Sequence, residues 1–176
     1  KTIEAEGGEA VVTELMDFML YCAHNDIFNY ETLAGKRSKA YIAKFIIWFL
    51  ERLRRDVKKA FAESKHFDPP KSIYDIAGKA KEVVSLGNQC GEGWLLTGEM
   101  VEMLDEGIEN IVCLQPFACL PNHVTGKGVM KILRKRNPKA NIVAIDYDPG
   151  ASEVNQLNRI KLMMGIAHKN LEAEGK

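Results

Sequence analysis

The sequence has few cysteines, no long apolar run and no excess of charge of either sign. Its four cysteines, Cys22, Cys90, Cys113 and Cys119, are too few and too irregularly spaced for a secreted disulfide framework, so reduced thiols are expected. The longest unbroken apolar run covers residues 45–50, far short of the roughly 20 residues that a membrane-spanning helix needs. Together these absences predict a cytoplasmic protein.

The charges of the chain cancel. Lys and Arg number 24, and Asp and Glu also number 24, so the formal net charge is zero. A neutral chain has no bulk attraction to nucleic acid or to an anionic membrane, and we expect neither as a partner. The 176 residues are 46% hydrophobic and 27% charged, which is typical of a globular protein. Because the sequence begins at Lys1 and not at Met, we expect a piece of a larger protein.

The first 81 residues carry helical patterns. Apolar residues recur with the helical period in three segments: 9–25, 38–62 and 72–81. Cys22 falls on the apolar stripe of the first segment and is expected in the core. Pro69 and Pro70 end the second segment, because an interior proline costs a helix about 3 kcal/mol. We therefore predict a helical region over residues 1–81 that packs on the rest of the chain.

The pattern changes after Lys81. Three short, nearly continuous apolar runs rich in β-branched residues cover 82–87, 110–115 and 141–146, and helical patterns over 94–106, 124–136 and 152–168 follow them in turn. Continuous apolar strands that alternate with helices are typical of a parallel sheet covered on both faces. The sequence therefore predicts an α/β domain over 82–176 with a three-layer Rossmann-like parallel sheet. Its last helix is expected to have Asp148 as its N-cap and Pro149 at its first position.

Polar loops follow each of the three predicted strands. In open parallel sheets, ligands bind beyond the carboxyl ends of the strands, so these loops are expected to share one binding edge. The candidate ligand-binding residues are Gly87, Asn88, Gln89, Gly91, Glu92 and Asp148. The glycine spacing does not match the dinucleotide fingerprint, and tight turns between strands and helices explain these glycines equally well. A phosphate or CoA-like ligand and a purely structural role both remain open.

The thiols separate into two groups. Cys113 lies within the second predicted strand and is expected to be buried, whereas Cys90 and Cys119 follow strand ends, where a thiolate can project into a cleft. His123, four residues after Cys119, completes a candidate metal site of Cys119, Cys90 and His123, although a histidine bonded to backbone at a helix entry is the alternative. A cubane iron–sulfur cluster normally takes four thiolates, and this chain offers two that are well placed.

Three long motifs resemble a known family. They are GNQCGEGWLLTGEM (87–100), QPFACLPNHV (115–124) and DYDPGASEVNQLNRIKLM (146–163). Over residues 82–165 the sequence closely resembles the C-terminal region of the large fused CoA-substrate-specific enzyme activases, which are related to the 2-hydroxyglutaryl-CoA dehydratase and benzoyl-CoA reductase system of anaerobes. The matched region is similar to the dehydratase-like part of those proteins and not to their ATPase.

The resemblance implies a role in electron transfer. In that family an ATP-hydrolysing activator passes low-potential electrons to a dehydratase or reductase component with its own iron–sulfur cluster. By the match of the second motif, Cys119 is a candidate cluster ligand in the full-length protein, and an isolated piece is expected to lack the cluster. The implied partners are the ATPase activator module and a CoA-thioester substrate, with no catalytic residue assigned. The alternative is a non-catalytic docking or small-ligand-binding domain.

Overall fold

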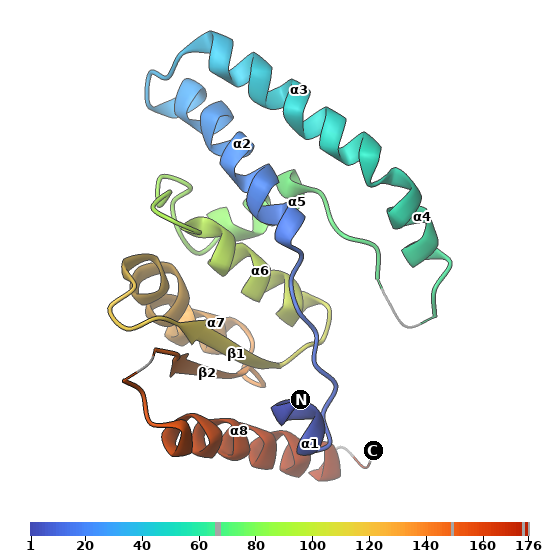
Figure 1. Cartoon of the computed structure of the whole chain (residues 1–176), viewed down its shortest axis with the longest axis vertical. Coiled ribbons are helices and arrows are strands. Elements are labelled where there is room, and N and C mark those ends of the chain that lie inside the picture. The colour runs from blue at the N-terminus through green and yellow to red at the C-terminus, as the bar shows by residue number, and fades with distance from the viewer. Residues whose placement is uncertain (66–67, 149, 174, 176) are drawn as a thin grey trace. The chain divides into compact units, whose positions relative to one another are not determined.

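The computed structural model describes residues 1–65, 68–148, 150–173 and 175 (Figure 1). The chain divides into two compact units. Thr13–Gly98 forms one, here called the inserted unit, and Lys1–Val12 together with Glu99–Lys176 forms the other, here called the sheet unit. The predicted domain boundary after residue 81 falls within the inserted unit. No helix in the described residues is both long enough and apolar enough to cross a membrane.

The inserted unit is helical. Its elements are α2 (Leu15–Thr32), α3 (Arg37–Leu53), α4 (Arg55–Ala62), α5 (Ile73–Lys81) and the start of α6 (Trp94–Asp105). The hydroxyl of Ser72 caps α5 by accepting a hydrogen bond from the backbone N–H of Tyr74 at 3.3 Å. Fully buried Leu20, Ile73 and Trp94 lie at the centre of one apolar cluster that joins α2, α3, α5 and α6. Packing of these helix faces, rather than a sheet, holds this unit together.

A buried guanidinium separates α3 from α4. Arg54 is only 6% exposed, and it donates hydrogen bonds to Asp17 Oδ1 at 3.0 Å, to Glu14 Oε2 at 3.1 Å, to Glu51 Oε1 at 2.8 Å and to the Lys71 carbonyl at 2.7 Å. Burial raises the pKa of the Asp17 carboxyl, against the opposing effect of the Arg54 guanidinium. Burial acts on Glu51 in the same direction, but hydrogen bonds from Lys58 and Arg54 hold its pKa below the ordinary value.

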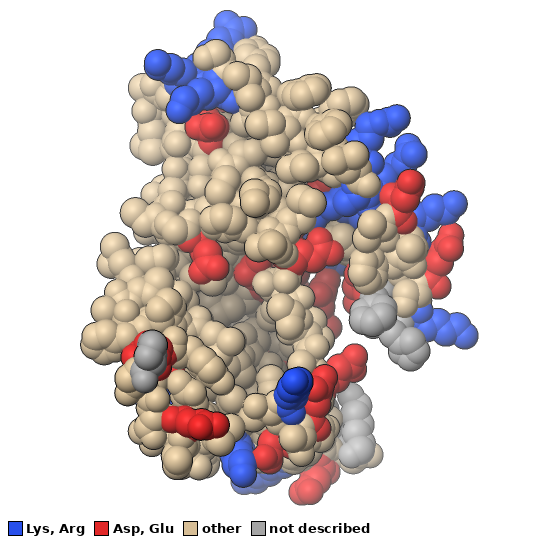
Figure 2. Space-filling model, in the orientation of Figure 1, with Lys and Arg blue, Asp and Glu red and all other residues tan. Residues whose placement is uncertain are grey.

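Positive charge gathers on α3 and α4. Residues 37–62 contain eight Lys or Arg and only two acidic residues, and Figure 2 shows these cations over the two helices. Tyr41, Phe45 and Trp48 are each more than half exposed on the side of α3 opposite the buried Ala43 and Ile47. The zero net charge of the chain therefore conceals a basic, partly apolar surface that acidic residues elsewhere in the sequence balance.

The sheet unit contains a two-stranded parallel sheet. Its elements are α1 (Thr2–Ala5), the end of α6, β1 (Asn110–Gln115), a π-helical turn η1 (Asn122–Gly126), a 3-10 turn η2 (Lys127–Val129), α7 (Met130–Arg136), β2 (Asn141–Asp146) and α8 (Glu153–Ala173). The register runs from Asn110 opposite Asn141 to Gln115 opposite Asp146, so both strands end at the same edge. Helix α8 packs Ile160, Met163 and Met164 against β2.

The predicted three-layer Rossmann-like sheet is wrong. Residues 110–115 and 141–146 form the parallel pair that the apolar runs predict, but no third strand joins them within the described residues. In the predicted first strand, the N–H groups of Val83 and Val84 both donate to the Ala80 carbonyl, so the run continues α5 as turns. Leu86 is buried in the helical cluster of the inserted unit. The described chain is mainly helical, with eight α-helices and one small sheet.

Candidate functional site

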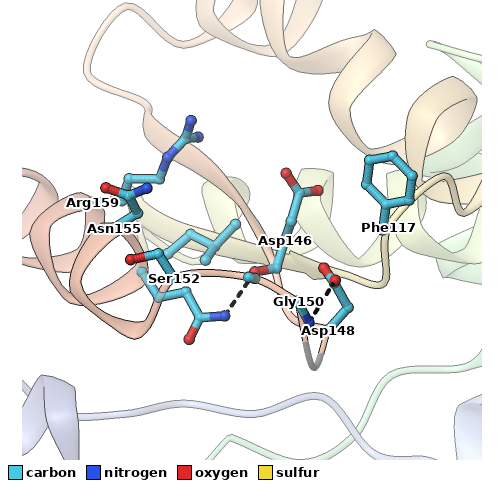
Figure 3. A pocket seen from close by; sticks show the side chains of 10 residues that line it. Phe117, Asp146, Asp148, Gly150, Ser152, Asn155 and Arg159 are labelled. Carbon is cyan, nitrogen blue, oxygen red and sulfur yellow. Dashed lines mark hydrogen bonds between the residues drawn. The ribbon is translucent and has the colours of Figure 1, made fainter.

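A pocket lies at the carboxyl end of β2 in the sheet unit (Figure 3). Its volume of about 410 Å³ falls within the range of roughly 300–1,000 Å³ that is usual for small-molecule sites. Residues from three places line it: Phe117 after β1, four residues around the end of β2 (Ile145, Asp146, Asp148 and Gly150), and residues at and just before the start of α8. The pocket therefore occupies the edge at which parallel sheets usually bind ligands.

The start of α8 breaks the apolar pattern of that helix. Ile160, Met163 and Met164 are buried on the side that faces the sheet. The preceding turns place polar residues along the same side and into the pocket: Ser152, Asn155, Gln156 and Arg159. Gln156 is half-buried and the other three side chains are exposed, so this wall of the pocket is polar and open to a ligand.

Two of these side chains are held by the backbone of β2. The amide Nε2 of Gln156 donates to the Asp146 carbonyl at 3.0 Å, and the Arg159 guanidinium donates through Nη1 to the Ala144 carbonyl at 2.9 Å. Both anchors fix the side chains beside the end of the strand. A guanidinium has five N–H donors, so this bond occupies one of the five that Arg159 offers.

The last residues of the two strands are paired and polar. Gln115 is 2% exposed, and its Nε2 donates to Asp146 Oδ1 at 2.5 Å. Its Oε1 is buried and has no hydrogen-bond partner within the described part of the chain. An unpaired buried acceptor costs free energy, about 1–3 kcal/mol. The carbonyl oxygen of the Gln115 side chain is therefore an acceptor unpaired among the described residues, and it lies on the residue that is hydrogen-bonded to Asp146, whose carboxylate lines the pocket.

Phe117 and Asp148 lie on the other side of the pocket. Phe117 is 77% exposed, and the next residue, Ala118, has a φ of +56°, a left-handed conformation that costs a non-glycine residue about 1–2 kcal/mol. Asp148 Oδ2 accepts a hydrogen bond from the Gly150 N–H at 3.2 Å. The predicted cap of α8 by Asp148 is wrong, because the helix begins at Glu153; Pro149, predicted to open it, lies outside the described residues.

Cys119 lies in the turn between β1 and η1. Its sulfur accepts a hydrogen bond from Asn122 Nδ2 at 3.2 Å, and Asn122 Oδ1 lies 3.8 Å from the sulfur of Cys113. The side chain of Asn122, which is 3% exposed, therefore connects the two thiols. His123 Nδ1 lies 2.9 Å from the Cys119 carbonyl oxygen. Of the two roles predicted for this histidine, metal ligation and a backbone hydrogen bond, the structure shows the second.

In comparisons with known proteins, no family model, no curated protein and no solved structure matches this chain.

The described residues do not assemble the predicted metal site. Across the described residues, no three or more His, Cys, Asp or Glu side chains lie close enough together to hold a metal ion. Cys119 and His123 are one helical turn apart, whereas Cys90 is exposed and belongs to the inserted unit. These residues alone do not fit an iron–sulfur cluster, and the approach of Cys90 to Cys119 stays a prediction. A cluster ligated by Cys119 remains a hypothesis about a longer protein.

The five candidates in the first predicted loop, Gly87, Asn88, Gln89, Gly91 and Glu92, also belong to the inserted unit. They follow no strand, and they build a turn instead. The Ser85 hydroxyl accepts from the Gly87 N–H at 3.2 Å, and the Asn88 carbonyl accepts from the Trp94 N–H at 2.8 Å at the start of α6. Of the predicted ligand-binding residues, the structure places Asp148 in the pocket.

We expect the four thiols to react at different rates with a maleimide reagent. Cys22 and Cys90 are exposed and should react first, followed by half-buried Cys119 and then by Cys113, which is 7% exposed in β1. Reaction of Cys113 requires local opening, and each 1.4 kcal/mol of opening free energy slows it about tenfold. Peptide mass spectrometry gives the rate for each site, with the protein unfolded in urea as the control. Faster labelling of Cys113 than of Cys119 would contradict this arrangement.

Proposed function

We propose that the sheet unit binds a small polar ligand at the carboxyl end of β1 and β2. We further propose that the chain is the dehydratase-like part of a cytoplasmic protein of CoA-thioester metabolism, acting with an ATPase activator module. The observation that carries the binding proposal is the group of polar side chains at and just before the start of α8, where Ser152, Gln156 and Arg159 line the pocket at the end of β2. The resemblance over residues 82–165 supports the wider role.

The physical argument for a ligand rests on unsatisfied chemistry. A helix that packs on a sheet gains stability from every apolar side chain that it buries. At the start of α8 the half-buried position of Gln156 holds an amide, and exposed Asn155 and Arg159 line the pocket beside it. Gln115 adds a buried acceptor that has no partner among the described residues, beside Asp146. The unpaired acceptor lowers the stability of the protein, and a ligand that binds the folded pocket would stabilise the fold by mass action.

The test is a binding screen with a variant that fills the pocket. Calorimetric melting would be measured with adenine nucleotides, CoA, ribose 5-phosphate and 2-hydroxyglutarate. In Ala151→Trp, an indole would occupy the cavity that Ala151 lines. Leu162→Trp is the control, because Leu162 is 71% exposed on α8. We expect at least one compound to raise the melting temperature of the unchanged protein and of Leu162→Trp, and to have no effect on Ala151→Trp.

A second variant guards against a folding defect in Ala151→Trp. Asn155→Ala removes a lining amide without adding bulk, and should weaken the same compound several-fold. If no compound in the screen binds, or if binding survives both Ala151→Trp and Asn155→Ala, the pocket is not the ligand site.

A further inference from the structure

The chemical character of the side chains that line the pocket differs from one side of the pocket to the other. In Figure 3 the ring of Phe117 stands on one side, Arg159 of α8 and Ser152 just before that helix stand on the other, and the carboxylates of Asp146 and Asp148 lie between them. The order across the pocket is therefore an aromatic ring, then carboxylates, then cationic and hydrogen-bond-donating groups. An occupant has to match all three in that order.

The α8 side suits an anion. The Ser152 carbonyl accepts the N–H of Gln156 at 3.1 Å, so the amides of residues 153–155 precede the first bond within this 21-residue helix. The positive end of the helix dipole lies there, and phosphate groups bind such ends. The Arg159 guanidinium, held by the Ala144 carbonyl, adds a fixed positive charge with a geometry that suits phosphate oxygens.

The middle of the pocket suits hydroxyl groups. Asp146 uses Oδ1 to accept from Gln115, which leaves Oδ2 as an acceptor, and Asp148 uses Oδ2 to accept from Gly150. Ionised carboxylates accept hydrogen bonds and repel anions, so a neutral donor fits between them and a second phosphate does not. A carboxylate at the end of a strand is the group that binds ribose hydroxyls in many α/β proteins.

The far side suits a flat ring. Phe117 is exposed although it lines the cavity, and the left-handed Ala118 fixes the turn that carries it. Exposed aromatic side chains bind nucleobases by stacking, and every base has a face that can stack. Stacking on Phe117 would also remove apolar surface of the ring from water.

We propose that the pocket binds a nucleoside phosphate, with its base on Phe117, its ribose hydroxyls on Asp146 and Asp148, and its phosphate at Arg159 and the start of α8. This proposal rests on the proposed ligand-binding function and names the class of ligand. The same chemistry occurs in a free nucleotide and in the adenosine phosphate portion of CoA. The order of the groups in the pocket is what distinguishes a nucleoside phosphate from a sugar phosphate or a hydroxy acid.

Isothermal titration calorimetry with four probes tests each part of the proposal. AMP should bind, ribose 5-phosphate should bind at least about fivefold more weakly because it lacks a base to stack, and inorganic phosphate should not bind detectably. CoA is the fourth probe. Binding of CoA at least about tenfold tighter than AMP would identify CoA as the source of the nucleotide, and equal or weaker binding would identify a free nucleotide.

Two variants test the contacts with the base and with the phosphate of the ligand separately. Phe117→Ala should weaken AMP at least about fivefold and leave ribose 5-phosphate unchanged. Arg159→Gln should weaken AMP on the order of tenfold or more and leave adenosine unchanged, because adenosine has no phosphate. Leu162→Ala, at an exposed site outside the pocket, is the matched control and should bind AMP as the unchanged protein does.

The outcomes distinguish the assignment of a nucleoside phosphate from the more general proposal that the pocket binds a small polar ligand. Equal affinity for AMP and ribose 5-phosphate, or unchanged AMP affinity in Phe117→Ala, would overturn the nucleoside assignment. If 2-hydroxyglutarate binds in the pocket and AMP and CoA do not, the site stands and its ligand is a hydroxy acid. If none of the probes binds, both proposals fail together.

Discussion

Arg54→Met should lower the free energy of unfolding of the inserted unit by about 3–5 kcal/mol. The substitution removes the cation that pairs with Asp17, whose side chain is 9% exposed, and it removes the donor to the Lys71 carbonyl. Asp17 would then be a buried carboxylate without its partner, or a protonated acid without its donor. Either state is far less favourable than the present ion pair.

The measurement is urea unfolding followed by tryptophan fluorescence. Both tryptophans of the sequence, Trp48 and Trp94, lie in the inserted unit, so the signal reports on that unit. Arg55→Met is the control, because Arg55 and its neighbour Asp56 are 69% and 89% exposed, and an exposed ion pair contributes at most about 1 kcal/mol. Similar unfolding curves for Arg54→Met and Arg55→Met would show that the buried cluster does not stabilise the fold.

Gly93→Ala should also be strongly destabilising, by about 2–5 kcal/mol from backbone strain and overpacking together. Gly93 has a φ of +44°, and a Cβ atom there would lie 2.0 Å from the Asn88 carbonyl oxygen and 2.5 Å from the Tyr21 hydroxyl. The Asn88 carbonyl accepts the first backbone bond at the start of α6, from Trp94. The new methyl group can fit only if this turn opens.

Gly78→Ala provides a control of opposite sign. Gly78 lies inside α5, and a Cβ atom added there would meet no described atom within 4 Å beyond the backbone of its own helix. Alanine at this position should therefore stabilise the helix by roughly 0.5–1 kcal/mol. The same fluorescence measurement applies to both variants, because both glycines lie in the inserted unit. Equal stability of Gly93→Ala and the unchanged protein would show that the turn at Asn88 is not as tight as the structure has it.

The strands show what local sequence can and cannot specify. The runs at 110–115 and 141–146 were predictable because β-branched residues favour strands. The expected cover on both faces is wrong for β1, whose burial alternates and leaves Leu114 56% exposed. The run at 82–87 has the same character and forms turns at the end of α5. A short apolar run is compatible with a buried strand or with the buried end of a helix, and periodicity does not separate the two.

The helices show the effect of tertiary contacts on a local pattern. Residues 38–62 predict one helix, but the structure has two, because Arg54 leaves helical geometry with a ψ of 4° where its guanidinium is buried among carboxylates. The prediction that Cys22 lies in the core is wrong, since α2 buries Leu20, Tyr21 and Ile27 instead and leaves Cys22 exposed. Cys113 is buried as predicted.

The candidate site was predictable in position but not in composition. Ligands of parallel sheets bind beyond the carboxyl ends of the strands, and the sequence identifies Asp148 at such an end. It does not single out Phe117, Gln156 or Arg159, which also line the pocket. The signal that would have found the last two is the helical period itself, which places them on the same side of α8 as Met163. Phe117 has no such signal, because its exposure depends on the fold of the turn around Ala118.

The insertion of one unit within the other couples them through the chain. The segment Lys1–Val12 belongs to the sheet unit, where Ile3 packs beside Met164 and the Glu6 carbonyl oxygen lies 3.0 Å from His168 Nε2. While Thr13–Gly98 is folded, its two ends are held at a fixed separation. Once it unfolds, it becomes a flexible loop whose closure costs about 4 kcal/mol of chain entropy. The packing of α1 on α8 is therefore more favourable when Thr13–Gly98 is folded, because the chain entropy of closing that loop is then already lost. This coupling does not require α1 to contact the inserted unit.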